Sequence, residues 1–165
     1  MRYLSDVSRE KIAGKISLLR TDFNIQKREE IFRLESALST IEFLKRHKSK
    51  IIILSHRGRP EKKIKAAKKF TLKIVLPFLK KKIKTPIIFL DSLNIEKIRK
   101  TVERSSRGEV FVMENLRLFS GEANNSFSFG NAIDLLSTDV AGHENKALGE
   151  IKLDATSSTE LATIK

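Results

Sequence analysis

The sequence predicts an α/β fold in which helices cover both faces of a Rossmann-like parallel sheet. Four short apolar runs have the composition of buried strands, and each is too short to form a helix. The segments between them carry apolar residues at helical spacing, and the runs begin 23 to 36 residues apart, which suits right-handed crossover connections. Alternating strands and helices are typical of a parallel sheet that is buried on both faces. The predicted strands are Ile16–Leu19, Ile51–Leu54, Ile87–Leu90 and Val110–Met113.

A first amphipathic helix is predicted between the first two strands. Apolar residues recur there at steps of three and four, which places them on one helical face. These residues are Ile31, Leu34, Leu38, Ile41 and Leu44.

Three more helices are predicted further along the chain. The second covers Leu72–Lys82, with Thr71 or a neighbouring residue as its N-cap. Pro77 falls within this segment, and we expect it to kink the helix or to end it early. The third helix lies around Ile95–Val102, and the fourth covers Phe127–Leu136.

The composition is that of a folded single domain from a reducing compartment. The chain has 165 residues, and its 40% hydrophobic content is enough for a core and too high for a disordered chain. The absence of cysteine excludes disulfides, cysteine-ligated zinc and a thiol nucleophile. No apolar run is long enough to span a bilayer, and the N-terminus lacks the apolar stretch of a secretory signal. We therefore expect a cytoplasmic protein that contacts no membrane.

The charge of the chain is strongly basic and unevenly distributed. The formal net charge of +13 favours anionic partners, either nucleic acid or small anionic substrates. Residues 1–117 hold 30 Lys and Arg against 13 Asp and Glu, whereas residues 118–165 hold 3 against 7. The last part also has weak periodicity, and no apolar run follows the fourth helix. We therefore predict that the next strand of the sheet is missing or degraded and that the tail is loosely packed.

Polar and basic residues follow three of the four predicted strands. Ligands of parallel α/β sheets bind beyond the carboxyl ends of the strands, so these residues are expected to share one edge. Guanidinium groups make two-pronged contacts with carboxylate and phosphate, and a carboxylate accepts a hydroxyl proton. The pattern therefore predicts a positive, concave site for a small anion that carries a hydroxyl group. The candidate residues are Asp22, Asn24, Arg33, His56, Arg59 and Arg117.

Spacing alone also allows a purely structural interpretation of these residues. Asp22 and Asn24 could hold their own backbone as turn residues. Arg20 could be an ordinary strand-end charge, His56 a satisfied polar residue, and Arg57 is expected to face solvent. The sequence contains no Walker-type phosphate loop, no defensible nucleophile–base pair and no metal-ligand spacing of histidines.

Four segments resemble, in the right order, motifs of the phosphoglycerate kinase family. LLRTDFNIQ (18–26) resembles the first-strand signature RxDFN, and FRLESALSTIEFL (32–44) is similar to the first helix, with Ser39 in place of the usual proline. IILSHRGRP (52–60) resembles the SHLGRP loop, with Arg57 in place of leucine, and GEVFVMENLRLFSGE (108–122) resembles the segment that contains ENLR. The resemblance covers residues 1–130, which we expect to correspond to the N-terminal, phosphoglycerate-binding domain of the family.

The resemblance implies an enzyme of glycolysis that transfers a phosphoryl group between ATP and the carboxylate of 3-phosphoglycerate. The fold of the family has two Rossmann-like lobes: the N-terminal lobe binds 3-phosphoglycerate, the C-terminal lobe binds Mg-ATP or Mg-ADP, and the enzyme is typically monomeric. Phosphoryl transfer of this kind depends mainly on positioning and on neutralising charge. Carried over motif by motif, the resemblance assigns contacts to the substrate hydroxyl (Asp22, Asn24), to the carboxylate and the group in transfer (Arg33, the catalytic residue) and to the phosphate (His56, Arg59, Arg117).

The chain also departs from the family pattern. The VNDAF strand and the AHR loop that follow the ENLR segment in the family are missing, and so is the nucleotide lobe. Residues 131–165 are therefore expected to be the divergent tail of a truncated or frameshifted product, with no cofactor-binding or metal-binding residue in this chain. Alone, the chain is expected to be catalytically incomplete, and a separately encoded nucleotide lobe would be needed for transfer.

Two other interpretations stay open. A basic module could track the phosphates of nucleic acid with the lysine-rich stretch Lys62–Lys84, although the aromatic residues sit in apolar patterns and predict no base-stacking platform. Alternatively, the chain could be a non-functional fragment. Steep salt dependence of binding would identify the first of these, and discrimination by ligand shape would identify a phosphoglycerate site.

Overall fold

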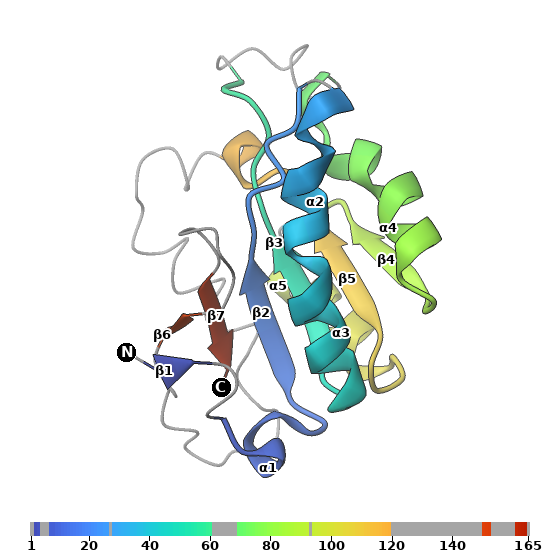
Figure 1. Ribbon diagram of the computed structural model, residues 1–165. Helices are drawn as coiled ribbons and strands as arrows, with labels where there is room; N and C mark the ends of the chain where they lie inside the picture. Colours follow the sequence, from blue (N-terminus) through green and yellow to red (C-terminus); the bar gives the residue numbers. More distant parts are fainter. Residues whose placement is uncertain are drawn as a thin grey trace.

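The fold is built around four parallel strands, close to where the sequence predicts them. The computed structural model describes residues 2–3, 7–26, 28–60, 69–92, 94–119, 150–152 and 161–164, and only the backbone of 2–3, 28–29, 150–152 and 161–164. The central strands are, in spatial order, β2 (Ile16–Arg20), β3 (Lys50–Leu54), β5 (Val110–Met113) and β4 (Ile87–Leu90) (Figure 1). These bounds differ from the predicted ones by at most one residue, which confirms the α/β fold class.

Three short strands extend the sheet beyond β2. The strand β7 (Leu161–Ile164) pairs antiparallel with β2, and β6 (Glu150–Lys152) pairs antiparallel with β7 and parallel with β1 (Arg2–Tyr3). No apolar run indicated these two strands of the tail, so the sequence-based prediction missed them, whereas the loss of the next strand of the sheet stays a prediction. Pairing with β7 satisfies backbone groups of β2 that an open sheet edge would leave without a partner, although LATI has little side-chain bulk to reveal a strand in the sequence. The predicted helix Phe127–Leu136 lies outside the described residues.

The first predicted helix is divided into three pieces. A 3-10 turn, η2 (Arg28–Ile31), leads into α2 (Phe32–Ser36), and α3 (Leu38–Arg46) follows after Ala37. The hydroxyl of Ser36 donates to the carbonyl oxygen of Arg33 at 2.9 Å, a local bond of the kind that bends helices. The apolar face nevertheless stays continuous, because the buried Leu34, Ile41 and Leu44 all pack into the same core.

Pro77 occupies the first turn of a helix and does not interrupt one. The predicted segment divides into a 3-10 turn, η4 (Leu72–Val75), and α4 (Leu76–Lys82), so Pro77 sits where its missing N–H costs little. The predicted N-cap is confirmed, since the Thr71 hydroxyl accepts a hydrogen bond from the Lys73 N–H at 3.2 Å. The remaining helical elements are α1 (Arg9–Ile12), α5 (Ile95–Glu103) and the 3-10 turn η5 (Leu116–Leu118).

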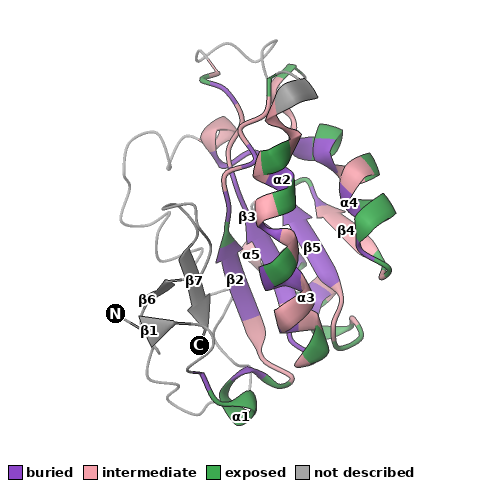
Figure 2. Ribbon diagram, viewed as in Figure 1, coloured by how far each residue is buried: buried purple, intermediate pink, exposed green. Residues whose placement is uncertain are grey.

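The parallel strands are buried on both faces, so the sheet separates two cores. Leu18, Ile52 and Phe111 share one transverse row and pack against α5 on one face. Leu19 and Ile53, each the next residue in its strand, point the other way and pack against α3 and α4. Figure 1 shows α2, α3 and α4 in front of the sheet and α5 behind it. Figure 2 shows β2, β3 and β5 as mostly buried and β4, at the edge of the sheet, as mostly intermediate. All four carboxyl ends therefore meet at one edge, from which the loops of the candidate site emerge. In the described part of the chain, no helix has the length and apolar character needed to cross a membrane.

Candidate anion-binding site

Hydrogen bonds fasten the carboxyl ends of three strands to one another. The Thr21 N–H donates to the Leu54 carbonyl oxygen at 3.0 Å, which continues the ladder between β2 and β3. Ser55, buried directly after β3, accepts from the Phe23 N–H and donates to the Thr21 carbonyl oxygen, both at 2.8 Å. Its own carbonyl oxygen accepts from the Leu116 N–H at 3.1 Å. We call the loops held in this way, residues 21–26, 55–60 and 114–119, the rim.

Asp22 and Asn24 hold the first rim loop in place. One carboxylate oxygen of Asp22 accepts from the Asn24 N–H at 3.1 Å. The side-chain oxygen of Asn24 accepts from the Gly58 N–H at 2.7 Å and so links the first loop to the second. The structural interpretation thus holds for Asp22, which caps its own turn, whereas the Asn24 side chain binds a distant loop and not its own backbone. Their contact with a substrate hydroxyl stays a prediction, and the Asp22 carboxylate keeps lone pairs that could accept one.

Arg33 reaches the rim from α2. Its guanidinium forms an ion pair with the second carboxylate oxygen of Asp22, and the two side chains are 33% and 29% exposed. The Arg33 Nε is buried and has no hydrogen-bond partner in the described part of the chain. The guanidinium also lies over the ring of Phe32, 5.5 Å from its centroid. A half-exposed arginine that is steadied on one side can still present donors to an incoming carboxylate.

Gly58 is the meeting point of the three rim loops. Besides receiving Asn24, it offers its carbonyl oxygen to the Arg117 Nη1 at 2.8 Å. Its φ of +61° is one that favours glycine, and a Cβ at this position would lie 2.3 Å from the ring of Phe70. The contacts therefore run without a break from Arg33 through Asp22, Asn24 and Gly58 to Arg117. His56 is half-buried and Arg59 is exposed in the same loop, so the structure brings all six predicted site residues to one edge.

Arg57 does not face solvent, contrary to expectation. Its Nε donates to the Ile25 carbonyl oxygen at 2.8 Å, and its Nη1 donates to the carbonyl oxygen of Lys69. The side chain therefore braces the first rim loop against the segment that leads into η4. A sequence pattern does not reveal this, because both acceptors are backbone atoms.

Two further rim residues were not selected from the sequence. Asn115 is fully buried and its side chain makes four hydrogen bonds to backbone groups. Glu114 accepts from the N–H groups of Leu72 and Asn115, at 2.8 and 2.7 Å, and from the Thr71 hydroxyl at 2.7 Å. In the sequence they directly follow an apolar strand and open the ENLR segment, but neither signal reveals these backbone contacts.

The rim has a net positive charge that suits an acidic ligand. The rim residues Arg57, Arg59 and Arg117, together with Arg33 from α2, outnumber the neighbouring carboxylates. These are the carboxylates of Asp22 and Glu114 and that of Glu30, which accepts from the Gln26 N–H at 2.6 Å. Arg57 and Arg117 donate to neutral carbonyl oxygens in the contacts described above, so their charge is held in place without being cancelled. Within the described ranges, no three His, Cys, Asp or Glu side chains are grouped so that they could hold a metal ion.

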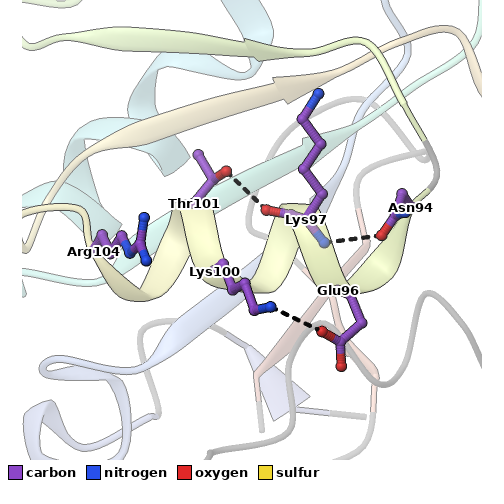
Figure 3. Close-up of a pocket in the computed structure, with 6 residues that line it drawn as sticks. All are labelled: Asn94, Glu96, Lys97, Lys100, Thr101 and Arg104. Carbon is purple, nitrogen blue, oxygen red and sulfur yellow. Dashed lines mark hydrogen bonds and ion pairs between the residues drawn. The ribbon is translucent and has the colours of Figure 1, made fainter.

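The outer surface of α5 carries a separate hollow that contains no predicted site residue. This pocket of about 560 Å³ is lined by Asn94, Glu96, Lys97, Lys100, Thr101 and Arg104. Figure 3 shows that all six side chains come from α5 or its two cap residues, Asn94 and Arg104, and that Lys100 is turned toward Glu96, with the ion pair at 3.4 Å. Because a single helix supplies this lining and one of its cations is paired, the rim is the better candidate.

Comparison with known proteins gives consistent matches to one family. The sequence model of the family described as phosphoglycerate kinase matches residues 5–141. The phosphoglycerate kinase of Buchnera aphidicola is 34% identical over 143 residues, which are 82% of this chain and 35% of that protein. The phosphoglycerate kinase of Bartonella tribocorum is 32% identical over 159 residues, or 92% of this chain and 39% of that protein. The chain thus spans a little over a third of the length of these curated relatives.

Solved structures give the same match at the level of the fold. The phosphoglycerate kinase of Coxiella burnetii superposes with a TM-score of 0.62 at 27% identity, over 82% of this chain and 32% of that one. The enzyme of Pyrococcus horikoshii also gives a TM-score of 0.62, at 23% identity, over 74% of this chain and 29% of that one. Because its identity is only 23%, the second match supports the fold alone.

Proposed function

This chain belongs to the phosphoglycerate kinase family, and from that premise we propose that its rim binds 3-phosphoglycerate. Members of the family are kinases, that is, phosphotransferases. The observation that carries the proposal is the unbroken run of contacts from Arg33 to Arg117, which places the predicted residues on one edge of the sheet. 3-Phosphoglycerate carries a carboxylate, a hydroxyl and a phosphate, and the rim offers guanidinium groups at both ends and a carboxylate between them.

Each end of the ligand meets a different set of side chains in this proposal. The phosphate lies against Arg59, Arg117 and His56, and the guanidinium groups supply two-pronged, charge-assisted hydrogen bonds. The hydroxyl donates to Asp22. The carboxylate lies toward Arg33, where it shares the guanidinium with Asp22.

Arg33 is the proposed catalytic residue of this part of the enzyme. In the family reaction a phosphoryl group passes between ATP and the ligand carboxylate, and catalysis depends on positioning and on neutralising the charge of the transferring oxygens. Arg33 would stabilise that charge where it develops. Mg-ATP or Mg-ADP supplies the phosphoryl donor or acceptor in the family. The described residues include no cluster that fits such a metal, and the roles proposed for the rim residues do not depend on one.

The wider cellular assignment follows from the family and stays part of the proposal. We place the chain in glycolysis and in the cytoplasm, as a monomer, with residues 1–130 as the phosphoglycerate-binding domain and residues 131–165 as a divergent tail. A nucleic-acid-binding role for the Lys62–Lys84 stretch has no support among the family and structure matches.

Calorimetric titration of the full chain with 3-phosphoglycerate tests the proposal. The variant Arg59→Ala should weaken binding by about tenfold, since one charge-assisted contact contributes about 1.5 kcal/mol or more. Arg104→Ala is the matched control, because it removes an exposed arginine at the C-cap of α5 and should leave the affinity unchanged. Equal losses in both variants would show that bulk charge, and not the rim, attracts the ligand.

A further inference from the structure

We propose that Asn115 is a positioning residue, which holds the Arg117 guanidinium in place for the phosphate of the ligand. The identity of the ligand rests on the proposed function, whereas the positioning itself rests on contacts of the described residues. Asn115 lies in the third rim loop, two residues after β5, and is 0% exposed. It is therefore placed to act through its neighbours and not by touching the ligand.

The side chain of Asn115 joins three separate backbone segments. Its Oδ1 accepts from the N–H groups of Arg57 and Arg117, at 3.2 and 3.1 Å. Its Nδ2 donates to the carbonyl oxygens of Arg57 and Phe70, at 2.7 and 2.9 Å. A primary amide has two donors and two acceptor positions, so all of its hydrogen-bonding capacity is used. The second rim loop, the start of η5 and the segment before η4 are thereby fixed relative to one another.

Both ends of the contact made by Arg117 depend on this junction. The Arg117 Nη1 donates to the carbonyl oxygen of Gly58 at 2.8 Å. Asn115 holds the N–H of Arg117 itself on one side and both backbone groups of Arg57, the residue before Gly58, on the other. A guanidinium has five N–H donors, so Arg117 keeps others for an anion. Fixing it in advance reduces the ordering that the ligand must otherwise impose on binding.

A merely structural role for Asn115 has to be separated from positioning. Loss of the amide would leave buried N–H and carbonyl groups without partners, and that alone lowers stability. Ser49 provides a matched control at the opposite, amino end of the same sheet. It is also 0% exposed, and its hydroxyl bonds to the Ser17 hydroxyl at 2.7 Å and the Lys15 carbonyl oxygen at 2.9 Å. Ser49→Ala therefore loses buried hydrogen bonds far from the rim.

The test compares Asn115→Ser with Ser49→Ala in the full chain. A serine at this position can still accept from the Arg117 N–H as an N-cap, but it is too short to reach Arg57 and Phe70. Asn115→Ser should weaken 3-phosphoglycerate binding by about tenfold, whereas Ser49→Ala should leave the affinity unchanged. In an Arg117→Ala background the effect of Asn115→Ser should shrink to about twofold or less, because the residue it acts through is gone. An undiminished effect in that background, or an equal loss in Ser49→Ala, would overturn the inference.

Measurements without the ligand, or without a variant, separate this inference from the proposed function. In ligand-free protein, Asn115→Ser should move the Arg117 Nε–H resonance toward its random-coil position, and an unmoved resonance would refute positioning whatever the ligand is. In the unsubstituted chain, 3-phosphoglycerate should slow hydrogen exchange of the Asn115 side-chain amide, and exchange that the bound ligand leaves unchanged would refute it as well. An unsubstituted chain that does not bind 3-phosphoglycerate refutes the proposed function instead.

Discussion

Gly58→Ala is expected to destabilise the fold more than any ordinary glycine-to-alanine change, because two separate costs act at this residue. The φ of +61° places Gly58 in the left-handed region, where a Cβ costs about 1–2 kcal/mol. The added Cβ would also lie 2.3 Å and 2.4 Å from two ring carbons of Phe70, so the ring has to move. Overpacking of this kind costs about 1–3 kcal/mol.

The two costs can be separated with a second glycine in the same backbone region. Gly108 has a φ of +83°, but a Cβ there would meet nothing closer than the Lys45 carbonyl oxygen at 3.8 Å. Alanine also lowers the conformational entropy of the unfolded chain, which stabilises the folded protein by about 0.4–1 kcal/mol at either site and offsets part of the cost. We therefore expect a loss of about 1 kcal/mol for Gly108→Ala and about 2–4 kcal/mol for Gly58→Ala.

Urea unfolding followed by circular dichroism measures this difference. With a slope near 2 kcal/mol per molar urea, a difference of about 2 kcal/mol moves the midpoint by about 1 M. Combining Gly58→Ala with Phe70→Ala removes the close approach, so within that background the alanine should cost about as much as it does at Gly108. If Gly58→Ala lowers the free energy of unfolding no more than Gly108→Ala does, the Phe70 ring moves aside at little cost. The close packing of the rim loops at Gly58 would then not limit which residue fits there.

Three further substitutions test one support at the amino end of the sheet and two at the rim. Lys50→Met removes hydrogen bonds at 2.7 and 3.0 Å to the last carbonyl oxygens of α5. Urea unfolding should show that the free energy of unfolding falls by about 1–2 kcal/mol while the affinity for 3-phosphoglycerate stays unchanged. An unchanged free energy of unfolding would contradict the contact. Thr71→Val removes the N-cap of η4 and the 2.7 Å hydrogen bond to Glu114. Thermal unfolding should show that the free energy of unfolding falls by about 1–2 kcal/mol. An unchanged midpoint would mean that these hydrogen bonds do not stabilise the fold. Arg57→Leu removes the 2.8 Å hydrogen bond to the Ile25 carbonyl oxygen. Calorimetry should show that this variant binds 3-phosphoglycerate more weakly and that Arg57→Lys binds it with intermediate affinity. Equal affinities of the unsubstituted chain and both variants would mean that Arg57 does not support the rim.

The sheet was predictable from the sequence because its strands are buried on both faces. Runs such as Ile51–Leu54 and Val110–Met113 are uninterrupted by polar residues, and their boundaries follow directly from composition. The break at Ala37 was not predictable, since the apolar spacing continues across it, and the neighbouring bond of the Ser36 hydroxyl to the Arg33 carbonyl oxygen leaves no periodic signal. The strands of the tail were not predicted, because their antiparallel pairing at the edge of the sheet depends on backbone hydrogen bonds. A short sequence of small residues gives little indication of such pairing.

The convergence of the site residues was predictable for a topological reason. Parallel strands bring their carboxyl ends to one edge, so Asp22, Arg59 and Arg117 had to approach one another whatever their side chains do. What spacing could not supply is the distinction between a residue that presents donors to a ligand and one that braces the loop. Arg57 and Asn115 are both polar and both follow a strand, yet their partners are backbone atoms on distant segments.

This distinction determines how the charge of the rim is expected to act. Asp22 pairs with Arg33 directly, whereas Arg117 donates to a neutral carbonyl oxygen and so keeps its full charge for an anion. A ligand that contacts both arginines must therefore carry two groups. One group binds the Arg33 guanidinium together with Asp22, and the other, at the opposite end of the ligand, is strongly acidic and binds Arg117. Inorganic phosphate satisfies only the second condition, so it should compete with 3-phosphoglycerate far more weakly than its charge alone suggests, and its competition should be abolished by Arg117→Ala but barely altered by Arg33→Ala. Equal competition by phosphate and 3-phosphoglycerate would mean that the two ends of the rim do not act on one ligand.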